Sequence, residues 1–189
     1  WGAASERLAL LTGGGKAMAD YATLSATQAQ HVRGELTDVL QGCVADGASV
    51  GFIDAEDDEV MTRFWQQRIA SITSGDSELL VARQHGCIVA TVIISRSGMP
   101  NGRHRAEISK LLVHPQARRQ GIARELMQRA ERRARAQGKT LLVLDTRSGD
   151  VASDLYRSLG WQVAGSIPCY AESIAGVLDA TTYMYKVLA

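Results

Sequence analysis

Ile108-Ser109-Lys110-Leu111-Leu112-Val113-His114-Pro115, followed after two residues by Arg118-Arg119-Gln120-Gly121-Ile122-Ala123, is the stretch that decides the fold. The first part is mainly apolar and ends at a proline, which is typical of a strand followed by a turn. The second part opens a predicted helix over residues 117–137, in which apolar residues recur at helical spacing. The expected inward positions are Ile122, Leu126, Met127, Ala130 and Ala134. A strand that leads into an amphipathic helix predicts helices packed on a sheet.

The start of this helix lacks an ordinary cap. The first turn of a helix leaves four backbone N–H groups unpaired, and Ser, Thr, Asp or Asn usually caps them. None of these residue types lies between His114 and Ala123. Gly121 lets the backbone approach a ligand, and Arg118 and Arg119 stand beside it. Uncapped amides, a helix dipole and cations together indicate a pyrophosphate site, although a solvated, arginine-rich helix start explains this short stretch equally well.

The rest of the chain supplies further strands and helices. A capping box of Ser25 and Gln28 opens a predicted helix over residues 25–44, and further helices are expected over residues 58–72 and 151–159. The strand at residues 140–144 is wholly apolar, so we expect burial on both of its faces. No internal repeat or long linker appears, so we predict one α+β domain. Apolar, β-branched runs predict the strands at residues 21–24, 78–83, 87–95, 105–113, 140–144, 161–167 and 181–187.

Composition narrows the class of protein. The 189 residues are 46% hydrophobic and 22% charged, which is typical of a globular domain. The formal net charge of +1 gives no global field for a nucleic acid or an anionic membrane, so neither partner is expected. Interspersed glutamates favour a solvated face for the arginines of residues 124–135 over a nucleic-acid surface. The three cysteines lack the spacing of a metal site or a disulfide framework, and no metal is predicted.

The N-terminus differs from the rest of the sequence. The chain begins with Trp1, carries three glycines at residues 13–15, and reaches a plausible start residue at Met18. We therefore expect residues 1–17 to be an extension outside the fold and residues 18–189 to form the domain. No signal-peptide core is recognisable, and no apolar run approaches the ~20 residues of a membrane-spanning helix. The expected location is cytoplasmic, and a homodimer is compatible with the sequence.

Two motifs resemble the GNAT superfamily of N-acetyltransferases. Arg118-x-x-Gly121-x-Ala123 after an apolar strand resembles its acetyl-CoA signature, with alanine at the third motif position. Leu155-Tyr156-Arg157-Ser158-Leu159-Gly160-Trp161 resembles its second hallmark, a tyrosine on a short helix before the sixth strand. The segments at residues 47–52, 100–102, 105–107 and 144–146 also resemble the tabtoxin-resistance acetyltransferases. The resemblance covers roughly residues 18–188, and it is poor before Gly47 and in the loop at residues 54–59.

The resemblance implies a GNAT-like mixed sheet of about seven strands, splayed between the fourth and fifth strands and flanked by about four helices. It implies acetyl-CoA as co-substrate, paired in the split with the backbone of residues 111–113 like an added strand. The pyrophosphate is then expected on the amides of residues 119–124, beside Arg118. The expected acetyl-CoA-binding residues are Leu111, Leu112, Val113, Arg118, Arg119, Gln120, Gly121, Ile122, Ala123, Arg124, Ser153 and Tyr156.

The implied chemistry is acetyl transfer to an amine. It needs a deprotonated nucleophile, donors for an oxyanion, and a proton for the leaving thiolate. Backbone N–H groups near Leu112 are the expected oxyanion donors and Tyr156 the expected acid, with core packing as the alternative role of Tyr156. The candidate bases are Asp145 and Glu107, either of which could instead be a structural partner of an arginine or a backbone amide. Asp145 is favoured slightly because the tabtoxin-resistance-like segment contains it.

The identity of the acetyl acceptor is the part of the function that the sequence determines least. Five acids occupy six positions from Asp54 to Glu59, which either favour a helix N-terminus or form a rim that attracts a cationic amine. The candidate substrate-binding residues are Asp54, Glu56, Asp57 and Asp145. The prediction is a small-molecule amine, aminoglycoside-like or tabtoxin-like, acetylated in a ternary complex to give antibiotic or toxin resistance. The alternatives are a non-catalytic acetyl-CoA-binding or peptide-binding module and a protein or peptide N-acetyltransferase.

Overall fold

The strands form one mixed sheet in a computed structural model that describes residues 18–188. The extension expected at residues 1–17 lies outside the described residues. Along the sheet the strand order is β1-β2-β3-β4-β5-β7-β6, with seven strands as predicted. The bounds are β1 Asp20–Leu24, β2 Ser77–Gln84, β3 Cys87–Arg96, β4 Arg105–Val113, β5 Leu141–Arg147, β6 Gln162–Glu172 and β7 Leu178–Val187.

Five α-helices accompany the strands within residues 18–188: α2 Ala26–His31, α3 Arg33–Ala45, α4 Asp58–Ser74, α5 Ile122–Ala136 and α6 Val151–Ser158. The capping box predicted at Ser25 and Gln28 is confirmed. The single helix predicted after it was wrong, because Val32 leaves the helical region at φ −108° and ψ 16° and separates α2 from α3. None of the helices in this part of the chain is long and apolar enough to cross a membrane.

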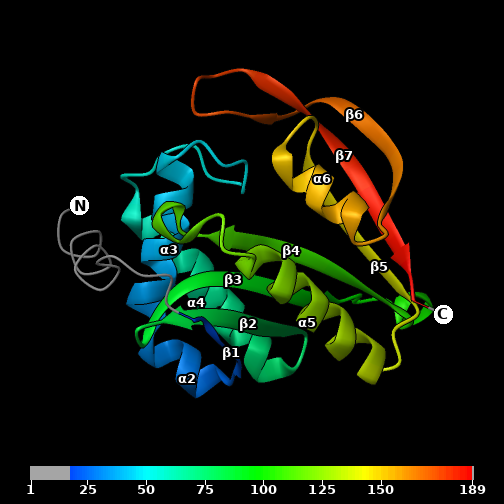
Figure 1. The fold of residues 1–189 in the computed structure, drawn as a ribbon, viewed down its shortest axis with the longest axis horizontal. Coiled ribbons are helices and arrows are strands. Elements are labelled where there is room, and N and C mark those ends of the chain that lie inside the picture. Colours follow the sequence, from blue (N-terminus) through cyan, green and yellow to red (C-terminus); the bar gives the residue numbers. More distant parts are fainter. Residues whose placement is uncertain (1–17, 189) are drawn as a thin grey trace.

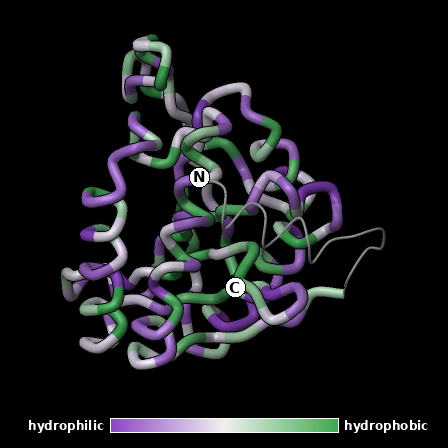
Figure 2. The backbone as a smooth tube through the Cα atoms, turned by 90° about the vertical axis from the view of Figure 1, so that its left-hand side faces the viewer, coloured by the Kyte–Doolittle hydropathy of each residue, from purple (hydrophilic) through white to green (hydrophobic). Residues whose placement is uncertain are grey.

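The helices cover the two faces of the sheet unequally. Helices α5 and α6 lie on one face, and α2, α3 and α4 lie behind the other, as Figure 1 shows. Each side has its own hydrophobic cluster: Leu126 and Leu142 belong to the α5 side, whereas Trp65 and Leu112 belong to the α3 and α4 side. In Figure 2 hydrophobic stretches run through the interior and hydrophilic stretches follow the outer helices. Strands β1 to β4 are therefore packed between two hydrophobic clusters, one on each face of the sheet.

The sheet splits between β4 and β5. These strands are parallel and pair only at one end, where Arg105–Glu107 face Leu141–Val143. Beyond that point they diverge, as Figure 1 shows, so the splay predicted between the fourth and fifth strands is confirmed. The prediction that residues 140–144 are buried on both faces was wrong. Leu142 and Leu144 are buried, but Leu141 and Val143 are only partly buried, because α3 and α4 pack on β2 to β4 and stop short of β5.

Candidate active site

The loop before α5 has an unusual backbone. Arg119 and Gly121 have φ angles of 62° and 76°, and Gly121 occupies the N-cap position of α5 without any side-chain cap. The helix starts at Ile122, later than predicted, because a 3-10 helix at Pro115–Ala117 and this loop precede it. A Cβ atom placed on Gly121 would meet no atom within 4 Å. The start of α5 is thus an open set of backbone N–H groups, which suits a pyrophosphate.

Side chains of the same loop and of the first turn of α5 contact four neighbouring parts of the chain. Arg118 forms an ion pair with Asp46, and its Nε donates to the Val113 carbonyl oxygen at 3.3 Å. Gln120 Oε1 accepts a hydrogen bond from Gln84 Nε2 at 2.7 Å. From the first turn of α5, Arg124 Nη2 donates to Ser158 Oγ on α6 at 2.9 Å. The loop therefore has a fixed position at the mouth of the split, with Arg119 exposed and the side chain of Ile122 buried in the core.

The edge of β4 that faces β5 is open. The pairing with β3 shifts between Ser109 and Leu112, Lys110 has a φ angle of 49°, and Thr91 Oγ1 donates to the Lys110 carbonyl at 2.9 Å. On the β5 side, residues 108–113 have no strand partner within the described chain. Extended peptide-like groups bind such an edge by strand addition. Residues 111–113, where Leu111, Leu112 and Val113 were predicted to act, lie along this open edge, although the Val113 carbonyl already accepts a hydrogen bond from Arg118 Nε.

Tyr156 comes from α6 on one face of the sheet. Its ring is buried, and the centroid lies 6.1 Å from that of Trp161, so the ring packs in the core, which was the alternative to the predicted acid role. No described residue accepts or donates a hydrogen bond at its hydroxyl. Burial, with smaller contributions from Asp150 and Asp145, raises the pKa of Tyr156 to about 12. The phenol therefore remains protonated at neutral pH, so it can act as a proton donor but not as a base. One turn earlier, Ser153 Oγ donates to the Asp150 carbonyl at 2.6 Å.

Asp145 and Glu107 lie on the opposite face from Tyr156, because residues on either side of each, such as Leu144 and Ile108, point into the α5 cluster. Both carboxylates are exposed, and both act electrostatically on Lys110, so the structure brings them to the same side of the split. Asp145 Oδ2 accepts a hydrogen bond from Thr181 Oγ1 at 2.9 Å. The structural partner of Asp145 is thus a threonine hydroxyl and not the arginine or backbone amide considered from the sequence, and the carboxylate is still exposed.

The acidic stretch has local contacts. Asp57 caps α4 by accepting a hydrogen bond from the Val60 N–H at 3.2 Å. Asp54 Oδ1 accepts from the Glu56 N–H at 2.9 Å. All three carboxylates are exposed, and none of these contacts reaches the split. The helix-start interpretation therefore accounts for Asp57 directly.

Two cations near the split were missed by the sequence analysis. Lys110 Nζ lies 5.3 Å and Arg68 Cζ 5.8 Å from the centroid of the Phe64 ring on α4. Burial lowers the pKa of Lys110, Arg68 lowers it further, and Asp145 and Glu107 oppose the shift. The signal in the sequence was a lysine inside the otherwise mainly apolar strand at residues 108–113.

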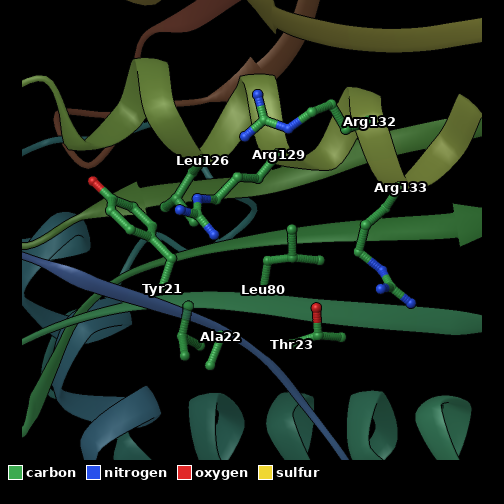
Figure 3. Close-up of a pocket in the computed structure, with 9 residues that line it drawn as sticks. Tyr21, Ala22, Thr23, Leu80, Leu126, Arg129, Arg132 and Arg133 are labelled. Atoms are coloured by element: carbon green, nitrogen blue, oxygen red, sulfur yellow. The ribbon is translucent and has the colours of Figure 1, made fainter. Parts of the chain in front are cut away.

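A separate pocket lies at the other end of the sheet, between β1, β2 and α5 (Figure 3). Arg129 and Arg133 line it, but they form ion pairs with Glu125 at 2.9 Å and Glu78 at 2.6 Å. The Arg129 guanidinium also stacks over the ring of Tyr21 at 4.5 Å. Because its arginines are already paired and none of the residues of the split lines it, this pocket is not the candidate active site.

Comparison with known proteins identifies the family. Residues 36–161 match the acetyltransferase (GNAT) family. The chain belongs to this family. GNAT members use acetyl-CoA as co-substrate, so this GNAT protein is an acyltransferase, as predicted. One relative, the uncharacterized N-acetyltransferase of the hisH-hisA intergenic region of Azospirillum brasilense, is 30% identical over 115 residues, which are 60% of this chain and 67% of the relative.

Solved structures share the fold of this GNAT protein. A phosphinothricin acetyltransferase from Sinorhizobium meliloti in complex with AcCoA is 20% identical with a TM-score of 0.74, over 90% of this chain and 89% of that one. A ribosomal-protein-alanine N-acetyltransferase from Brucella melitensis is 21% identical with a TM-score of 0.72, over 89% of this chain and 99% of that one. Their names give a small molecule and a protein as acceptors. The shared fold therefore leaves the acceptor to be argued from the site.

Proposed function

We propose that this protein transfers the acetyl group of acetyl-CoA directly to the amine of a small molecule within a ternary complex. One observation carries the proposal. The split presents a protonated phenol, Tyr156, from one face of the sheet and two carboxylates, Glu107 and Asp145, from the other, beside an open strand edge. A proton donor and a proton acceptor on opposite sides of one gap are what amide formation from an amine and a thioester requires.

Acetyl-CoA supplies the acetyl thioester when bound. The backbone of Leu111, Leu112 and Val113 would hold its peptide-like part along β4, and an N–H of this stretch near Leu112 would donate to the carbonyl oxygen where negative charge develops. The pyrophosphate would lie on the backbone amides of residues 119–124, with Arg118 alongside. Ser153, one turn before Tyr156 on α6, would border the same ligand. The open N-terminus of α5 supports this placement.

In this proposal, the group that takes the amine proton and the group that donates to the leaving sulfur lie on opposite faces of the sheet. We assign removal of the amine proton to Asp145 or Glu107, directly or through water, since both carboxylates are exposed. Tyr156 donates to the leaving sulfur. With a phenol pKa of about 12 and a thiol pKa of about 8.5, complete transfer is uphill by about 5 kcal/mol. Tyr156 therefore acts by a hydrogen bond that strengthens as charge develops on the sulfur, and the departed thiolate takes its proton from solvent, to which the carboxylate in turn releases the amine proton.

The acceptor we favour is a small amine of the tabtoxin type, whose acetylation would give toxin or antibiotic resistance. In support, one segment that resembles the tabtoxin-resistance acetyltransferases, residues 47–52, lies against the end of β5. Arg147, the residue directly after the resembling segment at 144–146, donates to the Gly47 carbonyl at 3.1 Å. A polycationic, aminoglycoside-like acceptor is the second candidate. The exposed carboxylates of Asp54, Glu56 and Asp57 favour it by their charge.

The test is release of free coenzyme A thiol from acetyl-CoA in the presence of a panel of amines, followed by mass spectrometry of the acceptor. We expect thiol release and a product heavier by one acetyl group. Glu107→Gln and Asp145→Asn, measured separately, identify which carboxylate serves as the base. If acetyl-CoA binds but no amine in the panel releases thiol, the protein is a non-catalytic acetyl-CoA-binding module and the proposal is wrong.

A further inference from the structure

Two positively charged side chains lie on the face of the sheet that carries Glu107 and Asp145, which we call the acceptor side of the split. Lys110 projects from the irregular part of β4 and Arg68 from α4, and both lie within 6 Å of the centroid of one ring, that of Phe64. A Cβ atom on Gly51 would lie 4.0 Å from Lys110 Nζ, so the loop between α3 and α4 passes close to this ammonium group. The cations thus lie at the boundary between α4, the α3–α4 loop and the open edge of β4.

Neither cation is neutralised by the protein. Within residues 18–188, no carboxylate lies within ion-pair distance of Lys110 or Arg68, and neither side chain donates a hydrogen bond. Arg68 Nε is buried as well as unpartnered. A buried donor of a cation costs free energy unless it has an acceptor, and two like charges side by side increase that cost. Such an arrangement is stabilised when an anion binds.

Opposite charges lie across the gap. Glu107 and Asp145 act electrostatically on Lys110 from the same face of the sheet, yet neither approaches it closely enough to form an ion pair. The acceptor side therefore has a positive end, with Arg68 on α4 and Lys110 on the irregular part of β4, and a negative end, with Glu107 on β4 and Asp145 on β5. A guanidinium and an ammonium are the ordinary protein partners of a carboxylate, and paired carboxylates are the ordinary partners of an ammonium.

We propose that Lys110 and Arg68 bind a carboxylate of the acceptor while Glu107 and Asp145 face its amine, so the substrates are amino acids or small amine-bearing carboxylic acids. This inference rests on the proposed function and names its substrate class. It disfavours a polycationic acceptor, because a second or third ammonium group would meet Lys110 and Arg68 at short range. The Phe64 ring, which is partly buried and lies within 6 Å of both cations, offers an apolar surface for the carbon chain of such a substrate.

The test compares each of the common L-amino acids with its carboxamide, which keeps the amine and loses the charge, and includes spermidine and kanamycin as polycations. We expect kcat/KM to be at least about tenfold higher for the carboxylate than for the carboxamide, mostly through KM, since charged hydrogen bonds have that magnitude. Lys110→Met and Arg68→Met should each move this ratio toward one. Arg63→Met is the matched control, because Arg63 lies on the same helix, is exposed and pairs with Glu59.

The outcomes separate this inference from the proposed function. Thiol release with carboxamides or polycations at least as fast as with carboxylates overturns the inference and leaves acetyl transfer standing. A carboxylate preference that survives in both Met variants also overturns it. Saturation-transfer NMR on the protein with coenzyme A measures binding of the same pairs without turnover. Carboxylate-dependent binding without any thiol release would support the inference and contradict the proposed function, and equal or absent binding of all pairs would contradict the inference.

Discussion

The two parts of the sheet on either side of the split differ in how they are covered. Strands β1 to β4 have helices on both faces, and residues such as Ile93 on β3 are almost fully buried. Strands β5, β7 and β6 have α6 on one face, and β6 is exposed along nearly its whole length, with Ile167 at 44% exposure. The first part contains most of the buried core, and the second supplies one wall of the candidate active site. The chemistry lies where pairing between the two parts ends.

The largest expected effect is on the free energy of unfolding, and a pair of matched substitutions, one in each part of the sheet, measures it. Ile93→Ala on β3 should destabilise the protein by about 2–5 kcal/mol, because it leaves a cavity in a core enclosed on both sides. Ile167→Ala on β6 should cost less than about 1 kcal/mol, because that side chain is already largely in water. Urea unfolding of both variants measures the difference. Similar losses would show that the exposed part contributes to folding as much as the covered part, and the division would be wrong.

The next effect concerns Tyr156 on α6, the helix that covers β5, β7 and β6 on the second side of the split. Tyr156→Phe keeps the ring against Trp161, so the free energy of unfolding should change little. The kcat should fall roughly 10²-fold with a smaller change in KM, because the lost hydrogen bond develops only as the thiolate leaves. Steady-state kinetics and a melting curve on the same sample measure both quantities. A variant with normal turnover would leave Tyr156 with packing alone and water as the hydrogen-bond donor to the sulfur.

Replacing Lys110, on the β4 edge of the split, should raise the stability of the protein and not lower it. Burial lowers its pKa below the usual 10.5, so the unfolded chain holds this proton more tightly than the folded chain. Wild-type stability therefore rises as the pH increases from the folded pKa toward about 10.5. Lys110→Met should be more stable than wild type at pH 7, by about 1 kcal/mol, with a difference that shrinks as the pH approaches 10.5. Urea unfolding at several pH values checks this, and a less stable variant at pH 7 would mean that Lys110 is stabilised by contacts in the free protein.

The smallest effect is expected from the acidic stretch, which belongs to the covered part of the molecule. Asp54→Asn, Glu56→Gln and Asp57→Asn together should lower stability by no more than about 1 kcal/mol, through weaker charge at the start of α4. The acceptor KM should not change. Kinetics at two salt concentrations are the measurement, since exposed charges are screened within ~10 Å at 0.1 M. A raised acceptor KM that diminishes with salt would instead favour a polycationic substrate.

Local features of the fold could be predicted from the sequence because a few adjacent residues determine them. The capping box at Ser25 and the bounds of β4 are confirmed, and Gly160, the residue directly after the helix predicted over residues 151–159, has a φ angle of 91°. All five residues predicted on the inner face of α5 are buried. Each of these signals depends on the chemistry of one turn or on one helical period, so no distant contact was needed to interpret it.

Features that depend on distant packing could not be predicted. One face of β5 is only partly buried because α3 and α4 cover β2 to β4 and do not extend across the sheet to β5. The residue pattern within 140–144 carries no information about that packing. The position of Lys110 beside Arg68 depends on an irregularity of β4 and on the placement of α4 across the sheet. Ion pairing of Arg118 with Asp46 joins residues 72 positions apart. The sequence therefore indicated Tyr156, Glu107 and Asp145 as candidate groups, and the structure was needed to find Lys110 and Arg68 and to decide which groups lie together.

Calorimetric titration of acetyl-CoA into two glycine variants tests the central claim, that the open start of α5 holds the pyrophosphate. Gly121 and Gly86 have φ angles of 76° and 75°, and a Cβ atom on either meets nothing within 4 Å, so Gly121→Val and Gly86→Val should suffer similar backbone strain. Only Gly121 borders the helix N-terminus. We predict that Gly121→Val weakens acetyl-CoA binding at least about tenfold and that Gly86→Val leaves it unchanged. Wild-type affinity in a folded Gly121→Val protein would contradict the account.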